Sequence, residues 1–418
     1  MSLATSTVNE QVNEQYEQWM YPEPIPDLEA YYAAGIAEEA EPRMMHWLYW
    51  PDGHYQFKKQ EAIDILVAGC GSNQAAKLAY THPKAKVVGI DMCSASLAHE
   101  QHLKEKHNLT NLTLHNLDLH DVATLTNTKD GKFDLIISSG VLHHLPDPLT
   151  GLKALKTVLR PKTGVLFAMV YGLYGRMGLY ALQQAFQLLG LGQTPNDVAM
   201  VRSVLAGLPA HHPVQPMLQN NLDMNYDAGI VDMFLHPMDH GFSVQDCLNW
   251  VDNAGLVFQG WLDPFAYEPA AWIKDPAVRA KLLALPKAQQ WQAMELLNGG
   301  IRMHSFMMCH PDRPQSSYQL NFNSPEFLNW IPIKRVHRVA EANAETNQPA
   351  WIQRDPHPPL PLTPPQAALY QAINNSHTVQ ECLTALKPFG EINDATAFGR
   401  SVLASLWELG LVLFYCPQ

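Results

Sequence analysis

The stretch from Ile65 to Gln74, Ile-Leu-Val-Ala-Gly-Cys-Gly-Ser-Asn-Gln, constrains the fold of this chain more than any other. An apolar run ends in Gly-x-Gly and a helical pattern follows at once, which predicts a buried strand, a tight turn and a helix start. Glycine lets the backbone turn sharply and approach a ligand without a Cβ in the way. The free N–H groups at a helix start favour a polar or anionic ligand group. The turn at Gly69 and Gly71 therefore predicts a ligand site.

A second apolar run, residues 85–90, ends in Asp91, about twenty residues downstream of the turn. An acidic residue at this place in a nucleotide-binding fold accepts hydrogen bonds from both ribose hydroxyls. The dinucleotide fingerprint Gly-x-Gly-x-x-Gly is incomplete, because Gln74 occupies the position of its third glycine. We therefore expect a nucleoside ligand rather than a dinucleotide.

Strand and helix patterns alternate between residues 63 and 170. The alternation predicts strands at 63–68, 86–90, 112–116, 133–138 and 165–170, and helices at 73–80, 94–107 and 149–159. Strands separated by helices of this length are typical of a parallel, doubly wound α/β sheet with right-handed crossovers. Ligands bind such sheets at the carboxyl ends of the strands. A small or polar residue follows each of these strands, which predicts a concave polar site at that edge.

Two further predicted strands, 256–262 and 303–309, complete a seven-stranded sheet with helical insertions at about 172–242 and 263–300. The last helices and a final strand resemble a winged helix. The predicted domains are an N-terminal aromatic and helical cap, the sheet domain, an extended proline-rich linker and a helical C-terminal module, at 1–60, 61–312, 313–365 and 366–418. The aromatic residues of the cap either pack on the next domain or form a lid over the ligand, for which Tyr16 and Tyr21 are the candidates.

The charge of the chain argues against a nucleic-acid partner. The formal net charge is −12 at pH 7, whereas a nucleic-acid-binding face is normally basic. From Thr363 onward only Lys387 and Arg400 are basic, too few to meet a phosphate backbone. The six cysteines are scattered without a Cys-x-x-Cys pair, which is typical of reduced thiols. Without a secretory signal or an apolar run of roughly 18 residues, we expect a cytoplasmic protein without a membrane partner.

The chain resembles the class I S-adenosylmethionine-dependent methyltransferases over about residues 60–310. The resemblance rests on the first turn at 66–71, on Gly-Ile-Asp at 89–91, on Asp118, on Phe-Asp-Leu-Ile-Ile-Ser-Ser-Gly-Val-Leu-His-His-Leu at 133–145, and on Leu-Arg-Pro-Lys-Thr-Gly at 159–164. It implies a Rossmann-like methyltransferase sheet and S-adenosyl-L-methionine as the cofactor.

The same resemblance implies how the cofactor is held. Gly69 and Gly71 would approach its methionine part, Asp91 its ribose and Asp118 its adenine, while residues 139–141 would line the far side. The predicted cofactor contacts are Ala68, Gly69, Cys70, Gly71, Gln74, Asp91, Met92, Asp118, Leu119, Ser139, Gly140 and Val141.

Candidate residues for the methyl acceptor follow the fourth and fifth strands and come from the segment Asp232–His240. An imidazole can take a proton near neutral pH, and an arginine can anchor a carboxylate or phosphate. We predict catalytic roles for His144, Tyr171 and His240, and acceptor contacts for Tyr174, Arg176 and His236. The segment Asp232–His240 is read as a loop above the acceptor, with a solvated turn and a metal site as alternatives. We expect no metal, because Pro237 interrupts helical presentation of the ligands.

Three functions are compatible with these features. The first is methyl transfer to a small-molecule acceptor, favoured by the acidic surface and by insertions large enough to enclose a compact molecule. The second is methylation of a protein or peptide side chain that the C-terminal module recognises. The third is S-adenosylmethionine binding without transfer. A nicotinamide oxidoreductase is disfavoured by Asp118 and by the segment 139–145.

Overall fold

The computed structural model describes residues 3–35, 42–55, 62–125, 128, 130–219, 221–335, 338–340, 350–354, 357–390 and 394–416. The chain divides into two compact units. Unit 1 comprises residues 1–41, 60–258 and 299–312, and unit 2 comprises residues 42–59, 259–298 and 313–418. None of the described helices is both long and apolar enough to cross a membrane.

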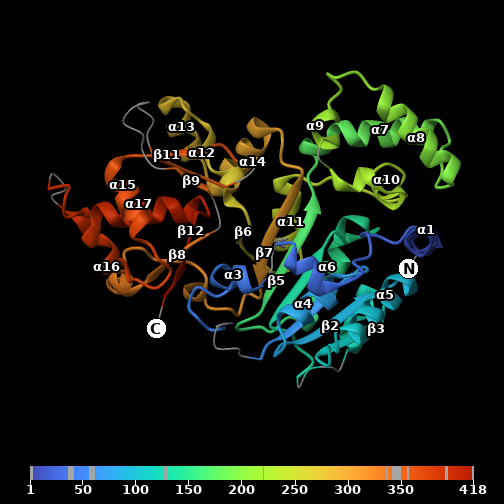
Figure 1. Cartoon of the computed structure of the whole chain (residues 1–418), viewed down its shortest axis with the longest axis horizontal. Coiled ribbons are helices and arrows are strands. Elements are labelled where there is room, and N and C mark those ends of the chain that lie inside the picture. Colours follow the sequence, from blue (N-terminus) through green and yellow to red (C-terminus); the bar gives the residue numbers. More distant parts are fainter. Residues whose placement is uncertain are drawn as a thin grey trace. The chain divides into compact units, whose positions relative to one another are not determined.

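A seven-stranded sheet forms the centre of unit 1, with strand order β3-β2-β1-β4-β5-β7-β6 (Figure 1). The first five strands run parallel, and β7 is antiparallel to β5. This arrangement confirms the predicted doubly wound, Rossmann-like fold. The strands are β1 (Asp64–Ala68), β2 (Lys86–Asp91), β3 (Leu112–Asn116), β4 (Leu135–Ser139), β5 (Val165–Tyr171), β6 (Val257–Trp261) and β7 (Met303–Cys309).

The strand order reverses between β1 and β4, and this reversal places the ligand site. In such sheets the crevice for a ligand opens where neighbouring connections leave in opposite directions. Residues 65–68 of β1 are fully buried, as expected for a central parallel strand covered on both faces. The connecting helices are α4 (Gln74–Thr81), α5 (Ser94–Lys106) and α6 (Pro148–Val158), with α11 (Val244–Asn253) before β6.

The insertion after β5 is helical, as predicted, and has an apolar core of its own. Its elements are η4 (Tyr174–Arg176), α7 (Met177–Leu188), α8 (Pro195–Gly207), α9 (Gln215–Leu218), η5 (Leu222–Asn225) and α10 (Asp227–Phe234). Leu182 and Phe186 face this core, whereas Met177 and Leu189 are 59% and 66% exposed. Trp19 packs against this core from the N-terminal segment, which forms α1 (Leu3–Gln18) and α2 (Leu28–Ala33).

Unit 2 contains segments from all four predicted domains. Instead of an extended linker, residues 313–365 contain short helices and strands whose buried side chains join one apolar core with the C-terminal helices. Pro361 lies in β11, an edge strand, where a residue without an N–H is tolerated. The elements before the C-terminal helices are α3 (Pro42–Tyr49), η6 (Pro264–Tyr267), α12 (Pro269–Trp272), α13 (Pro276–Leu283), α14 (Lys287–Asn298), η7 (Gln315–Ser317), η8 (Pro325–Asn329), β8 (Ile331–Lys334), β9 (Arg338–Ala340), β10 (Ala350–Gln353) and β11 (Leu360–Leu362).

The expected C-terminal helices and final strand are present. They are α15 (Pro364–Ala372), α16 (Val379–Leu383), η9 (Thr384–Leu386), α17 (Ala395–Glu408) and β12 (Val412–Tyr415). The final strand β12 pairs antiparallel with β8, which precedes all of these helices in the chain. The structure therefore does not confirm the winged-helix assignment.

Candidate active site

A cavity of about 340 Å³ lies at the carboxyl ends of the central strands of unit 1. The predicted cofactor residues that line it are Gly69, Cys70, Gly71, Gln74, Asp91, Met92, Asp118, Leu119, Ser139, Gly140 and Val141. Ala68 is not among the lining residues, because it lies one position back within β1 and is fully buried. The sheet edge thus brings predicted cofactor residues from four segments of the chain to one space.

The turn after β1 needs glycine for two separate reasons. Gly69 and Gly71 have φ of +78° and +55°, in the left-handed region that costs other residues about 1–2 kcal/mol. A Cβ on Gly69 would also lie only 2.3 Å from Cγ2 of Val141, which closes the turn from the β4 side. The backbone therefore comes close to the cavity only because no side chain intervenes.

Asp91 is held at the end of β2 by backbone donors. Its carboxylate accepts hydrogen bonds from the N–H of Gly71 at 2.8 Å and from that of Cys93 at 2.9 Å. Burial raises the pKa of Asp91, and these backbone donors oppose the shift. The carboxylate is thereby fixed against the Gly-rich turn while it lines the cavity.

Asp118 caps the short helix η2 (Leu119–Thr124) that follows β3. Its Oδ1 accepts from the backbone N–H of His120 at 2.8 Å and lies 2.7 Å from Nδ1 of the same residue. The cap fixes the direction of the chain, so Asp118 and Leu119 both reach the cavity.

The N-terminal segment covers the cavity through Tyr16, Tyr21 and Pro22. It is attached to the Gly-rich turn, because the Ser72 hydroxyl donates to the carbonyl of Pro22 at 2.7 Å and the Asn73 amide donates to that of Glu23 at 3.0 Å. The positions of both tyrosines are those expected of a lid. Their closing over a bound ligand stays a prediction.

His144 and Tyr171 also line the cavity, as their places after β4 and at the end of β5 suggested. Nδ1 of His144 lies 2.7 Å from the carbonyl oxygen of Met238, to which it donates, and this leaves the lone pair on Nε2. The ring of His144 stacks on that of His236 with centroids 3.9 Å apart. Burial lowers the pKa of His144 and of His143, so both imidazoles are neutral near pH 7.

A buried hydrogen-bond chain lies behind this pair of rings. The Tyr16 hydroxyl donates to Oδ1 of Asp232 at 3.0 Å and lies 3.3 Å from Nε2 of His236. Burial raises the pKa of Asp232 to about 7, with the nearby Asp239 carboxylate adding to the shift. Asp232 therefore changes charge close to neutral pH.

Arg176 does not line the cavity, contrary to its predicted contact with the acceptor. Its guanidinium lies 3.5 Å from the centre of the Tyr171 ring and 3.6 Å from Oδ2 of Asp239, and the side chain is almost fully buried. Arg176 thus neutralises an internal carboxylate and supports the Tyr171 ring. The Tyr171 ring, which does line the cavity, covers one face of the guanidinium.

Tyr174, His236 and His240 are also outside the cavity lining, and His240 is exposed. The segment Asp232–His240 does return to the same sheet edge, as expected, but it presents His236 and Asp239 inward and His240 outward. The predicted roles of Tyr174 and His240 toward the acceptor stay predictions without a supporting contact.

Sequence reasoning missed several lining residues. Lys77 lies one helical turn after Gln74, and Met169 lies two residues before Tyr171 on the same face of β5, so periodicity alone could have identified both. Val12 and Asn13 belong to a mostly polar helix that carries no sequence signal for a ligand site.

Residues 59–221 match a family described as a methyltransferase domain. A protein of Synechococcus, described as uncharacterized, is 30% identical over 278 residues, which are 65% of each chain. The ubiquinone biosynthesis O-methyltransferase of Acinetobacter baumannii is 26% identical over 132 residues, 32% of this chain and 52% of that protein. The chain therefore spans about two thirds of the first relative and half of the second.

The structure of PKMT2 from Rickettsia typhi has a similar fold, with a TM-score of 0.62 at 17% identity. The match covers 89% of this chain and 74% of that chain. A second structure of PKMT2, in complex with AdoHcy, gives a TM-score of 0.61 at 15% identity. The similarity of fold thus extends over most of both chains.

Proposed function

Because residues 59–221 match a methyltransferase domain family, we propose that this chain transfers the methyl group of S-adenosylmethionine to a small-molecule acceptor. The observation that carries the proposal is the single cavity that joins the Gly69–Gly71 turn and Asp91 to His144 and Tyr171. A cofactor held by this turn and by Asp91 points its sulfonium group toward His144 and Tyr171.

Methyl transfer requires little of the protein beyond positioning the two reactants. A sulfonium methyl group is already electrophilic, so the nucleophile needs to be held in line, roughly 3–3.5 Å from the methyl carbon, with water excluded. The lone pair on Nε2 of His144 can accept a hydrogen bond from an acceptor hydroxyl or amine. The rings of Tyr16, Tyr21 and Tyr171 exclude water and favour the cationic sulfonium through their π faces.

The size of the cavity supports a compact acceptor. Ligand pockets span about 300–1,000 Å³, and this one, at about 340 Å³, is near the lower end although it would also hold the cofactor. The lid position of Tyr16 and Tyr21 narrows the entrance further. A small molecule fits this description better than a folded protein surface does.

A protein or peptide side chain is the second candidate acceptor. A separate surface groove in unit 2, lined by Phe322, Asn323, Asp394 and Arg400 among others, favours it. The groove offers one aromatic ring, one acidic group and one basic group to a peptide segment.

Calorimetry on the full chain tests the cofactor first. S-Adenosylhomocysteine is expected to bind with one site per chain, and NAD is expected to give no heat. Binding of NAD without a response to S-adenosylhomocysteine would overturn the proposal.

Transfer from methyl-labelled S-adenosylmethionine to a fractionated cell extract then tests the acceptor. Label in the small-molecule fraction supports the first candidate, and label in the macromolecular fraction supports the second. Cofactor binding without transfer to either fraction would favour the third function, a binding protein without catalysis.

A further inference from the structure

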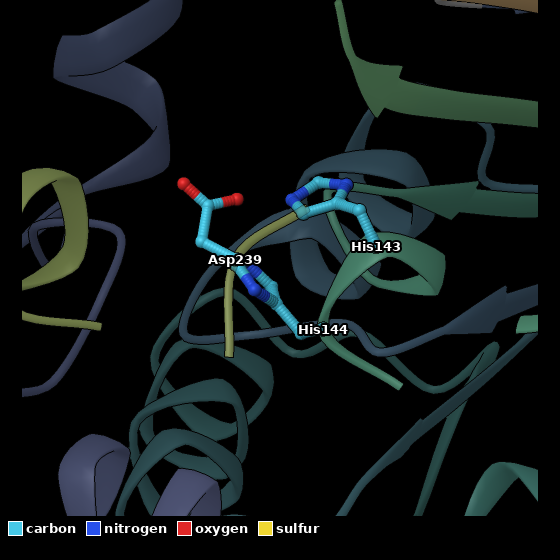
Figure 2. Close-up of side chains that lie close together, drawn as sticks. All are labelled: His143, His144 and Asp239. Atoms are coloured by element: carbon cyan, nitrogen blue, oxygen red, sulfur yellow. The ribbon is translucent and has the colours of Figure 1, made fainter. Parts of the chain in front are cut away.

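Three side chains beside the acceptor end of the cavity form a set of nitrogen and oxygen donors. Figure 2 shows His143 and His144, from η3 (Leu142–His144), next to Asp239, from the loop after α10. One ligand atom from each residue lies within 4.8 Å of those of the other two, and all three side chains are buried or nearly so. We propose that these residues bind one divalent metal ion of the borderline class, such as Zn²⁺, Fe²⁺ or Co²⁺.

His143 is the first observation behind this proposal. Its side chain is fully buried, and neither ring nitrogen has a hydrogen-bond partner. Buried polar atoms in native proteins nearly always have a partner. The ring is held 4.1 Å from that of Tyr171 and 4.1 Å from that of His144, centre to centre, so it cannot turn to solvent without breaking this packing. A metal ion would satisfy one of its nitrogens.

His144 and Asp239 are each held as metal ligands usually are. A metal-bound histidine typically donates its other ring nitrogen to a carbonyl or carboxylate, which fixes the tautomer. Nδ1 of His144 makes such a bond to the carbonyl of Met238, so Nε2 is left to bind an ion. Oδ2 of Asp239 accepts from the Gln183 amide at 2.9 Å and lies 3.6 Å from Arg176. Oδ1 of Asp239 has no partner and is left to bind the ion.

A second set, made of His144, Asp232 and His236, fits an ion less well, although its ligand atoms are as close together. Nδ1 of His236 accepts from the N–H of Met238 at 3.0 Å, so the proton is on Nε2, which faces the Tyr16 hydroxyl. Oδ1 of Asp232 already accepts from the same hydroxyl. The free donor atoms therefore belong to His143, His144 and Asp239.

The donor types decide which ions suit the site. Two imidazoles and one carboxylate are typical of catalytic zinc and of non-haem iron, with positions left open for a substrate. Magnesium and calcium prefer oxygen ligands. Bonds of about 2.0–2.2 Å to the ion would place the ligand atoms about 3–3.5 Å apart. Because these atoms now lie within 4.8 Å of one another, their separations need to shorten by up to about 1.8 Å.

An ion at this position would bind the oxygen of the acceptor. This bond would replace the hydrogen bond that the acceptor hydroxyl otherwise donates to Nε2 of His144. A bound metal lowers the pKa of a coordinated hydroxyl, so the hydroxyl would lose its proton to solvent. Its oxygen would then bond to the methyl carbon as the carbon–sulfur bond breaks and S-adenosylhomocysteine leaves. This part of the inference rests on the proposed function and favours an acceptor with an oxygen nucleophile. The metal site itself does not depend on it.

Titration of the full chain, stripped with a chelator, with Co²⁺ tests the site without cofactor or acceptor. One ion per chain is expected, with the visible ligand-field bands of a low-symmetry nitrogen and oxygen site. The variants His143→Ala, His144→Ala and Asp239→Asn should weaken this binding at least tenfold. Gln183→Ala, which removes the support of the carboxylate, should weaken it to a smaller extent.

His102→Ala is the matched control, because His102 is exposed on α5 next to His99 and offers Co²⁺ an adventitious surface pair. Its Co²⁺ bands should equal those of the parent. Absence of binding to the parent, or loss of the bands in His102→Ala with binding retained in His143→Ala, would overturn the proposal. Unfolding temperature shows that each variant is folded, and calorimetry with S-adenosylhomocysteine on the metal-free chain tests the proposed function separately.

Discussion

The two halves of the cavity are built in different ways. The cofactor half consists of residues that directly follow β1, β2, β3 and β4, and its close contacts are made largely by backbone: the glycine turn, and the N–H groups that hold Asp91. The half assigned to the acceptor is lined by side chains from α1, η3 and β5. Residues of α10 and of the loop after it do not line the cavity, but they hold these side chains through hydrogen bonds between residues up to 220 positions apart. The first half depends on the sheet alone, and the second depends on the insertion and the N-terminal segment packing against that sheet.

This contrast predicts separable effects. A change in the cofactor half should reduce affinity for the cofactor, and a change in the acceptor half should reduce turnover and leave that affinity unchanged. Variants that affect both properties equally would show that the halves act as one.

The largest effect is expected from His144→Ala. Loss of a group that acts on the proton of the acceptor typically costs 10²–10⁴-fold in rate, while affinity for S-adenosylhomocysteine should change less than about threefold, within the 0.6 kcal/mol that such a factor represents. The affinity for S-adenosylhomocysteine is measured by calorimetry. The rate of methyl transfer is measured by the release of S-adenosylhomocysteine in the presence of acceptor. The same assay on His240→Ala tests the catalytic role predicted for that residue, which the cavity lining does not support.

Gly69→Ala should show how far the cofactor half depends on backbone shape. The added Cβ meets Val141 and is strained at positive φ, so a destabilisation of roughly 2–5 kcal/mol is expected from the sum of both costs. Gly190→Ala is the control, because Gly190 also has positive φ but open space around its Cβ position. Urea unfolding gives the free energy of unfolding of the two variants. Equal losses of stability would show that the contact with Val141 does not contribute to the effect at Gly69.

Asp91→Ala should weaken S-adenosylhomocysteine binding by one to two powers of ten in a folded protein. Loss of hydrogen bonds to a charged group costs about 1.5–3 kcal/mol, and each 1.4 kcal/mol is a factor of ten. Asp121→Ala, at an exposed acidic residue of η2, is the control. Undiminished binding by Asp91→Ala would show that Asp91 does not hold the ribose.

The smallest effect concerns pH and Asp232 in the acceptor half. Its pKa is about 7 in the folded protein against an ordinary value of 3.8, so the folded state keeps a proton that the unfolded chain releases. The resulting stability is fully present below about pH 3.8 and is lost as the pH rises through 7. The free energy of unfolding should therefore fall, relative to Asp232→Asn, by up to about 1.4 kcal/mol per pH unit between pH 5 and 7.

Urea unfolding of parent and Asp232→Asn in metal-free buffer at three pH values measures this difference. The neighbouring histidines, whose pKa is lowered by burial, act in the opposite direction. They are present in both proteins, so their effect cancels. Parallel stability curves would show that Asp232 is ionised throughout.

The sequence by itself determined the sheet and the cofactor half of the cavity. Apolar runs that end in Gly69, Asp91 and Ser139 predict parallel strands, and parallel strands deliver their last residues to one edge whatever packs around them. These signals are local, because each lies within a dozen residues of its own strand. That is why all the predicted cofactor contacts other than Ala68 line the cavity together.

Only the tertiary structure decided the acceptor half and the division into units. The return of the insertion to the sheet decides whether Arg176 faces the cavity or Asp239. It also decides whether His236 or His240 points toward the interior of the protein. Similarly, residues 313–365 have the composition of a linker, but their buried aromatic side chains pack with helices that follow later in the chain. Contacts between residues so far apart in the sequence leave no local pattern. The neighbours of a polar or aromatic residue in the sequence do not show which distant residue it will contact.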